Sequence, residues 1–211
     1  MRIAILGAGN VGSAVARAAA KAGHQVVVSA PSADKAQAVA AEVGGTAAGS
    51  NQQAVADADM VVLAVPYGAI DQVAGEIGPA VRGKVVVDVT NPMRADASGL
   101  AVSDRSGAEE IQDKLPGAAV VKAFNTVFAA NQAAPVVDGT GLDGFYAGDD
   151  EQAKQQVAQL LAAMGYRPVD AGPLSAALPL EHMAFLNISM NARNNWPWQS
   201  GWKLVGPGPQ S

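Results

Sequence analysis

Short apolar runs alternate along the chain with longer segments in which apolar residues return at helical spacing. The short runs are rich in β-branched residues and apolar on both faces, and they cover RIAIL 2–6, QVVVS 25–29, DMVVLAV 59–65, KVVVDV 84–89 and AVVKAF 119–124. Strands that are buried between two helix layers have this composition. The pattern therefore predicts a strand in each of these runs.

The segments between the runs predict helices at 13–23, 33–44, 67–81 and 106–115. Several of them end near glycine, which tolerates the left-handed conformation at a helix C-terminus. Repeated strand–helix–strand units form a parallel sheet through right-handed crossovers, with helices on both faces. We therefore expect an α/β fold with a doubly wound parallel sheet.

After residue 126 the alternation becomes looser. The predicted elements are an irregular loop, a strand with a turn, a helix, a short strand and a long final helix, at 129–143, 144–150, 150–165, 166–174 and 175–193 in that order. The tail that follows holds all three tryptophans. We expect a single domain over 1–211, with its core in 1–126 and a small C-terminal extension and tail in 127–211.

The charge and composition narrow the function classes. The net charge of −5 and the sequence pI of about 4.9 argue against the broad basic face that duplex nucleic acid requires. The chain has no cysteine, which excludes disulfides and thiolate sites. No apolar run reaches the roughly 18 residues of a membrane helix, and the start of the chain lacks a signal-peptide pattern. We expect a cytoplasmic protein that binds a small molecule and neither nucleic acid nor membrane.

The first predicted strand leads directly into a G-x-G-x-x-G motif at Gly7, Gly9 and Gly12, and a helix is predicted to begin near Asn10. Gly7 permits a tight turn, Gly9 lets a pyrophosphate approach the backbone, and Gly12 lets the helix pack closely on the strand. The unpaired N–H groups around Asn10 and Val11 attract phosphate. The order of strand, motif, helix and second strand predicts a dinucleotide-binding core, whereas a glycine turn alone would only indicate positive φ angles.

The end of the second predicted strand selects the cofactor. NAD-specific sites usually place Asp or Glu there to bind the ribose hydroxyls, and this chain has neither at that point. Ser29, Ser32 and Lys35 offer hydrogen bonds and a positive charge to a 2′-phosphate, so we expect NADP, although the lack of an arginine leaves NAD open. The alternative is that Ser32 caps the next helix and Lys35 is a solvated surface charge.

Ligands of doubly wound sheets lie beyond the carboxyl ends of the strands. Three later strand ends carry candidate cofactor-binding residues, namely Ala64, Val65 and Pro66, then Asn91 and Pro92, then Asn125. We expect Asn91, Pro92 and Asn125 to bound the nicotinamide end. Val65 and Pro66 are expected either to join them there or to form a flat apolar wall against the adenosine side or ribose. The alternatives are loop rigidity for the prolines and hydrogen bonds to nearby backbone for the asparagines.

No Ser–His–Asp or zinc-binding constellation is present in the sequence, so no catalytic residue and no metal site are assigned. A reaction that needs a proton donor would depend on His182, Tyr67 or Thr126.

The sequence resembles the coenzyme F420-dependent NADP oxidoreductases, which are related to the N-terminal domain of pyrroline-5-carboxylate reductase and the reductase domain of STEAP proteins. The matching segments are MRIAILGAGNVGSAVA 1–16, VVLAVP 61–66, GKVVVDVTNP 83–92, VVKAFNT 120–126 and AGDDEQAKQQVAQLLAAMGYRPVDAGPLSAA 147–177. The AGDD and RPVDAGPL stretches are the most specific, because a generic dinucleotide fold does not require them.

The resemblance implies an NADP-binding enzyme, usually a homodimer, that exchanges hydride between nicotinamide and a flavin or a deazaflavin such as coenzyme F420. This reaction mainly requires two rings placed about 3–3.5 Å apart without water. Lys35 matches the family's lysine after the second strand. Two other functions stay open, namely reduction of a small imine or carbonyl compound and non-catalytic NADP(H) binding by a sensor or assembly protein. The tail tryptophans are candidates for stacking on a planar ring or for packing against the body or a partner.

Overall fold

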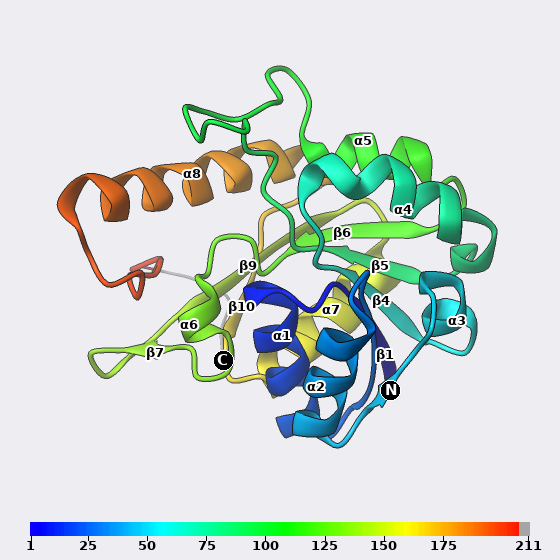
Figure 1. The fold of residues 1–211 in the computed structure, drawn as a ribbon. Coiled ribbons are helices and arrows are strands. Elements are labelled where there is room, and N and C mark those ends of the chain that lie inside the picture. The colour runs from blue at the N-terminus through cyan, green and yellow to red at the C-terminus, as the bar shows by residue number, and fades with distance from the viewer. Residues whose placement is uncertain (207–211) are drawn as a thin grey trace.

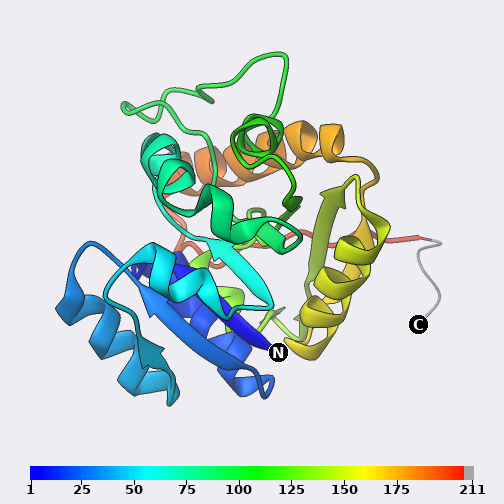
Figure 2. The same cartoon turned by 90° about the vertical axis from the view of Figure 1, so that its right-hand side faces the viewer.

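An eight-stranded sheet with helices on both faces forms the body of the protein (Figures 1 and 2). The computed structural model describes residues 1–206. The strands of the sheet are β1 (Arg2–Leu6), β2 (Gln25–Ser29), β3 (Thr46–Ala47), β4 (Met60–Leu63), β5 (Val85–Asp88), β6 (Ala119–Ala123), β9 (Asp143–Gly148) and β10 (Arg167–Asp170). Their order across the sheet is β10-β9-β6-β5-β4-β1-β2-β3.

The sheet is covered by α-helices and short 3-10 turns. The α-helices are α1 (Asn10–Lys21), α2 (Ala33–Val43), α3 (Asn51–Ala56), α4 (Ile70–Ile77), α5 (Gly107–Lys114), α6 (Ala129–Gln132), α7 (Glu151–Ala163) and α8 (Ala177–Asn194). The 3-10 turns are η1 (Tyr67–Ala69), η2 (Gly78–Val81) and η3 (Leu174–Ala176).

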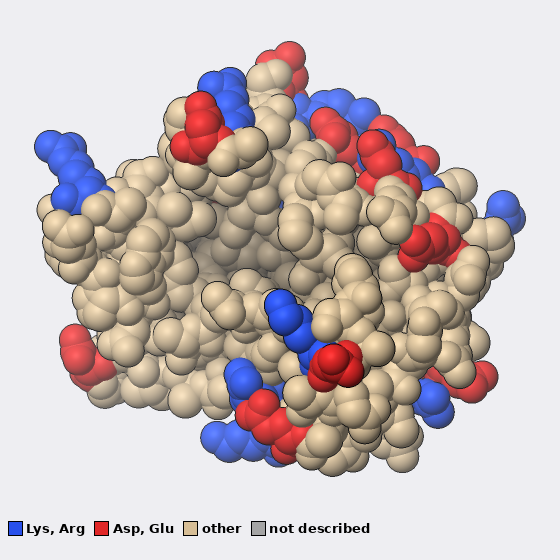
Figure 3. Space-filling view, in the orientation of Figure 1, with Lys and Arg blue, Asp and Glu red and all other residues tan. Residues whose placement is uncertain are grey.

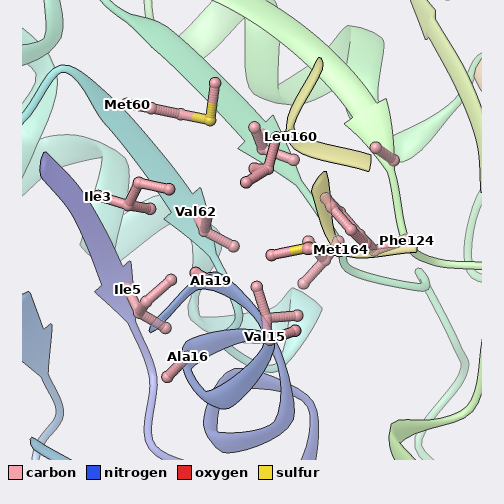
Figure 4. Close-up of a cluster of buried hydrophobic side chains, with 14 of the residues drawn as sticks. Ile3, Ile5, Val15, Ala16, Ala19, Met60, Val62, Phe124, Leu160 and Met164 are labelled. Atoms are coloured by element: carbon pink, nitrogen blue, oxygen red, sulfur yellow. The ribbon is translucent and has the colours of Figure 1, made fainter. Parts of the chain in front are cut away.

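Alternate residues of the buried strands face two separate apolar layers. Ile3 and Ile5 pack with α1, α2 and α7, and Figure 4 shows Leu160 of α7 in this layer. Ala4 and Leu6 point to the opposite face, where they pack with α3, α4 and α5. Because both faces are covered, the strands are apolar on both sides, which accounts for the runs seen in the sequence.

The segment after residue 126 completes the same sheet. β9 pairs antiparallel with β6, and β10 pairs parallel with β9. Val157 and Leu160 of α7 lie in the same apolar cluster as Ile3 of β1. The predicted doubly wound α/β fold is confirmed. The pairing of β9 with β6 is the one antiparallel pairing in this otherwise parallel sheet.

The prediction of an irregular loop at 129–143 is wrong in two places. Ala129–Gln132 form α6, and β7 (Val136–Val137) pairs antiparallel with β8 (Thr140–Gly141). The buried amide of Gln132 donates hydrogen bonds to the carbonyl oxygens of Phe124 at 3.0 Å and Val127 at 3.1 Å. These hydrogen bonds stabilise a helical turn that is too short to show a helical pattern of apolar residues in the sequence. The short elements β3 and α3 were likewise not predicted.

Among residues 1–206, no helix combines the length and apolar character that crossing a membrane demands.

Candidate functional site

The turn between β1 and α1 is shaped by its glycines. Gly7 has a φ of +118°, and a Cβ there would lie 2.2 Å from the carbonyl oxygen of Ala64. A Cβ on Gly12 would lie 2.0 Å from the carbonyl oxygen of Gly7. A Cβ on Gly9 would meet nothing within 4 Å. Gly7 and Gly12 are therefore required by backbone packing, whereas the bare backbone at Gly9 borders space that a ligand can fill.

The N-terminus of α1 is well suited to an anion. Gly9 provides no side-chain cap, and the first turn contains no acidic residue. The first hydrogen bond of the helix runs from the N–H of Ser13 to the carbonyl oxygen of Gly9 at 2.9 Å. The preceding N–H groups have no partner within the helix and carry the positive end of its dipole. This geometry fits the phosphates of a dinucleotide.

A first cavity of about 340 Å³ opens beside this turn. Its walls are the glycine turn, residues 29–32 with Lys35, residues 64–66, and side chains from α3 and the start of α4. Lys35 is the only charged residue among these described lining residues. Ser32 also caps α2, because its Oγ accepts the N–H of Lys35 at 3.4 Å. The serine thus has a structural role, and the lysine supplies positive charge at the cavity edge.

A second cavity of about 290 Å³ lies on the other side of the turn, where Val11 forms part of its wall. Figure 3 shows a hollow in this face of the molecule, below α8 and above the start of α1, with few charged side chains around it. The remaining walls come from the loops after β5 and β6, from α8 and from Trp198. None of the described lining residues has a titratable side chain.

Asn91 and Asn125 come from separate loops and bind each other in the second cavity. Asn91 Nδ2 donates to the carbonyl oxygen of Asn125, and Asn125 Nδ2 donates to Asn91 Oδ1, both at 3.1 Å. The buried Oδ1 of Asn125 and Oγ1 of Thr126 have no partner within residues 1–206. Buried polar atoms are rarely left unpaired. These two atoms therefore offer hydrogen bonds to a polar ligand, and a carboxamide is chemically suited to both.

The backbone is strained at the end of β6, beside the same cavity. Phe124 has a φ of +64°, which is unfavourable for a bulky residue. Its carbonyl oxygen accepts a hydrogen bond from Gln132 Nε2 at 3.0 Å, and Gln132 Oε1 in turn accepts one from the Tyr166 hydroxyl at 2.6 Å. Residues held in such conformations cluster at functional sites. The fold thus fixes the path of the chain into Asn125 and Thr126.

A fully buried ion cluster lies beneath these loops. Lys122 Nζ donates to Asp88 Oδ2 and Glu181 Oε1, both at 2.8 Å, and to the carbonyl oxygen of Thr90 at 2.7 Å. The Lys122, Asp88 and Glu181 side chains have no exposed surface. Burial alone lowers the pKa of Lys122, but the two carboxylates outweigh it and raise this pKa above its ordinary value. The cluster ties β5, β6 and α8 together at the edge of the second cavity.

The proton-donor candidates are not gathered at one place. His182 lies on the exposed side of α8, outside both cavities, and its ring nitrogen contacts the carbonyl oxygen of Leu178 at 2.9 Å. The Tyr67 hydroxyl donates a hydrogen bond to Glu110. Burial raises the pKa of Tyr67 above its ordinary value, and this hydrogen bond raises it further. Thr126 alone of the three lines the second cavity.

Trp198 reaches the second cavity from the C-terminal tail. Its ring packs edge-to-face on Phe128 with centroids 5.5 Å apart. The tail is tied to the body on both sides of Trp198. Before it, the N–H of Trp196 donates to the carbonyl oxygen of Asn191 at 3.0 Å, and after it, Ser200 Oγ accepts from Asn191 Nδ2 at 2.6 Å. The composition of the tail suggested a stacking role, but which tryptophan reaches the site depends on these long-range contacts.

The structure groups the predicted site residues differently from the sequence analysis. Val65 and Pro66, expected either against the adenosine side or at the nicotinamide end, line the first cavity with Ser29 and Lys35. The second cavity contains Val11, Asn91 and Asn125. The described walls of the two cavities do not include Asn10, Gly12 or the buried Pro92, and Ala64 lines the first cavity. Asn51 and Gln72, which also line the first cavity, gave no signal in the sequence.

An open α/β sheet, a glycine turn at a helix N-terminus and a cavity on each side of that turn define a Rossmann-type dinucleotide-binding fold. The comparisons with known proteins narrow this class. Residues 2–92 match the sequence model of the family described as NADP oxidoreductase coenzyme F420-dependent. The chain is 31% identical to an F420-dependent NADP reductase of Methanothermobacter marburgensis, over 92% of this chain and 94% of that protein. The protein belongs to the family of coenzyme F420-dependent NADP oxidoreductases.

Two further similarities agree with this assignment. The crystal structure of a putative F420-dependent NADP-reductase from Arthrobacter sp. FB24 superposes with a TM-score of 0.86 and 26% identity, covering 96% of this chain and 99% of that chain. Rat metalloreductase STEAP3 is 33% identical to this chain over a matched segment that covers 62% of this chain and 26% of that protein. The resemblance to F420-dependent NADP oxidoreductases with STEAP relatives, inferred from the sequence, is confirmed.

Proposed function

We propose that this protein is an oxidoreductase that transfers hydride between NADP(H) and a deazaflavin of the coenzyme F420 type. The observation that carries the proposal is the position of the two cavities. Gly9 borders the first and Val11 the second, so they flank one uncapped helical turn. A dinucleotide bound with its pyrophosphate on that turn has one nucleoside on each side. Family membership, and the names of the full-length relatives, support NADP and F420 as the substrates.

We assign the residues of the site as follows. The backbone of the first turn holds the pyrophosphate, through Gly7, Gly9, Asn10, Val11 and Gly12. Ser29, Ser32 and Lys35 face the adenosine ribose and its 2′-phosphate. Ala64, Val65 and Pro66 form the wall beside them, and Asn91 and Asn125 bound the nicotinamide end. Pro92, which is buried and lines neither cavity, follows Asn91 in that loop.

When bound, NADPH would supply the hydride that the deazaflavin accepts, and the accompanying proton would come from solvent. The chain's contribution is placement. The free Oδ1 of Asn125 accepts from the nicotinamide carboxamide, and the hydroxyl of Thr126 is available as a second partner. Trp198 and Phe128 give the acceptor ring an aromatic wall and keep water from its face. The lack of titratable side chains among the described lining residues favours ring-to-ring hydride transfer over imine or carbonyl reduction, which needs a proton donor.

Anaerobic mixing of NADPH with a deazaflavin, FMN or FAD tests the proposal, with absorbance of both partners followed in a stopped-flow instrument. We expect rapid NADPH oxidation with the deazaflavin. Tight NADPH binding without turnover of any of these acceptors would contradict the enzymatic function and favour a nucleotide sensor. Titration with NADPH and NADH decides the cofactor, and we expect NADPH to bind more tightly because Lys35 pairs with its 2′-phosphate.

The homodimer and the cytoplasmic location stay predictions. The same holds for the division of the single domain 1–211 into a core over 1–126 and an extension over 127–211. Sedimentation of the full chain checks the oligomeric state.

A further inference from the structure

The outer end of the first cavity contains two amide side chains that one carboxylate holds in place. Asn51 Nδ2 donates to Glu76 Oε2 at 2.7 Å, and Gln72 Nε2 donates to Glu76 Oε1 at 2.9 Å. Asn51 begins α3, whereas Gln72 and Glu76 lie one turn apart on α4. Both amides line the cavity, and Glu76 itself does not.

The carboxylate decides which way each amide points. An ionised carboxylate only accepts hydrogen bonds, so both NH₂ groups must face Glu76. The bonds from Gln72 and then Asn51 lower the pKa of Glu76, which keeps it ionised at neutral pH. The carbonyl oxygens of Asn51 and Gln72 therefore remain as acceptors, and no group within residues 1–206 donates to them.

This end of the cavity is the place for the base, an inference that depends on the proposed dinucleotide function. The pyrophosphate lies at the glycine turn and the ribose beside Ser29 and Lys35, so the base extends further along the same wall. That wall is apolar and is formed by Val65, Pro66, Ala69 and Val73. A flat heteroaromatic ring packs on such a surface while its polar edge meets the amide carbonyls.

We propose that Asn51 and Gln72, oriented by Glu76, select adenine by accepting hydrogen bonds from its 6-amino group. A base with a 6-oxo group places an acceptor against two acceptors, which is unfavourable. Adenine and hypoxanthine have the same ring size and differ mainly at this edge. The protein therefore discriminates between the two bases by polarity rather than by shape.

Calorimetric titration with NADPH and with reduced nicotinamide hypoxanthine dinucleotide phosphate tests this selectivity by binding alone. We expect the hypoxanthine analogue to bind wild type at least about tenfold more weakly. In Glu76→Gln the amide at position 76 also donates, so Asn51 and Gln72 are free to turn over. The ratio of the two Kd values should then fall to about threefold or less.

Glu42→Gln is the matched control, because Glu42 pairs with Arg17 on the surface and lines neither cavity. It should keep the wild-type ratio. Gln72→Leu is a second variant on an exposed position, and it should also lower the ratio. Equal binding of both dinucleotides to wild type, or an unchanged ratio in Glu76→Gln and Gln72→Leu, overturns the inference while leaving the proposed function intact. Failure of both dinucleotides to bind at millimolar concentration overturns both.

Discussion

Replacing Lys122 by methionine removes the only cation of the buried cluster. Methionine matches the length of the lysine stem but leaves Asp88 and Glu181 without a counter-ion and the carbonyl oxygen of Thr90 without its donor. Removal of one partner from a buried ion pair costs about 3–5 kcal/mol. We therefore expect Lys122→Met to lose about 4 kcal/mol of unfolding free energy, which a domain of ordinary stability, about 5–15 kcal/mol, survives.

The double variant Lys122→Met/Glu181→Gln gives a sharper test. In the wild-type background, Glu181→Gln removes one of the two carboxylates that pair with Lys122 and should destabilise the fold. In the Lys122→Met background the same change removes an uncompensated buried carboxylate and should stabilise it. Burial already raises the pKa of Glu181, with the Lys122 ammonium opposing this rise. A raised carboxyl pKa makes the fold less stable as pH increases, so Lys122→Met should gain stability relative to wild type between pH 7 and pH 5.

Urea unfolding followed by circular dichroism measures these free energies, provided the slope with urea is unchanged. Lys114→Met is the matched control, because Lys114 forms an exposed ion pair with Asp71. It should cost less than about 1 kcal/mol. A loss of under about 1 kcal/mol for Lys122→Met, or the same sign for Glu181→Gln in both backgrounds, would refute the reasoning that Lys122 neutralises this cluster.

The remaining predictions concern the site and the tail. Gly9→Val should weaken NADPH binding at least about tenfold in a titration while leaving the urea midpoint unchanged, because its Cβ enters open space; Gly12→Val should lower the midpoint instead. Trp198→Ala should raise the KM for the deazaflavin, whereas Trp196→Ala, which does not line the second cavity, should not. Burial raises the pKa of Asp143, but the hydrogen bonds from Arg167, Leu204 and Lys203 outweigh burial and hold this pKa below its ordinary value. Its stabilisation is therefore fully present above about pH 4, the ordinary range of an aspartate, and is lost progressively as pH falls further. Asp143→Asn should accordingly lose less unfolding free energy than wild type between pH 5 and pH 3.

The local sequence carried enough information for the sheet and the glycine turn. Runs such as RIAIL and QVVVS are apolar on both faces because helices cover both sides of the sheet, and that requirement is visible residue by residue. The motif at Gly7, Gly9 and Gly12 sits where a strand passes into a helix, and the carbonyl oxygen that excludes a side chain at Gly12 belongs to Gly7, five residues earlier in the chain. Short-range steric rules therefore predicted the fold class and the turn.

Tertiary structure alone decided which residues meet. Lys122, Asp88 and Glu181 come from two strands and a distant helix, and only packing joins them. The pairing of Glu76 with Asn51 likewise joins two helices, and Trp198 reaches its cavity because Trp196 before it and Ser200 after it both bind Asn191 of α8. Polar contacts between residues far apart in sequence leave no periodic pattern, because their free energy depends on burial and geometry that arise only when the chain has folded.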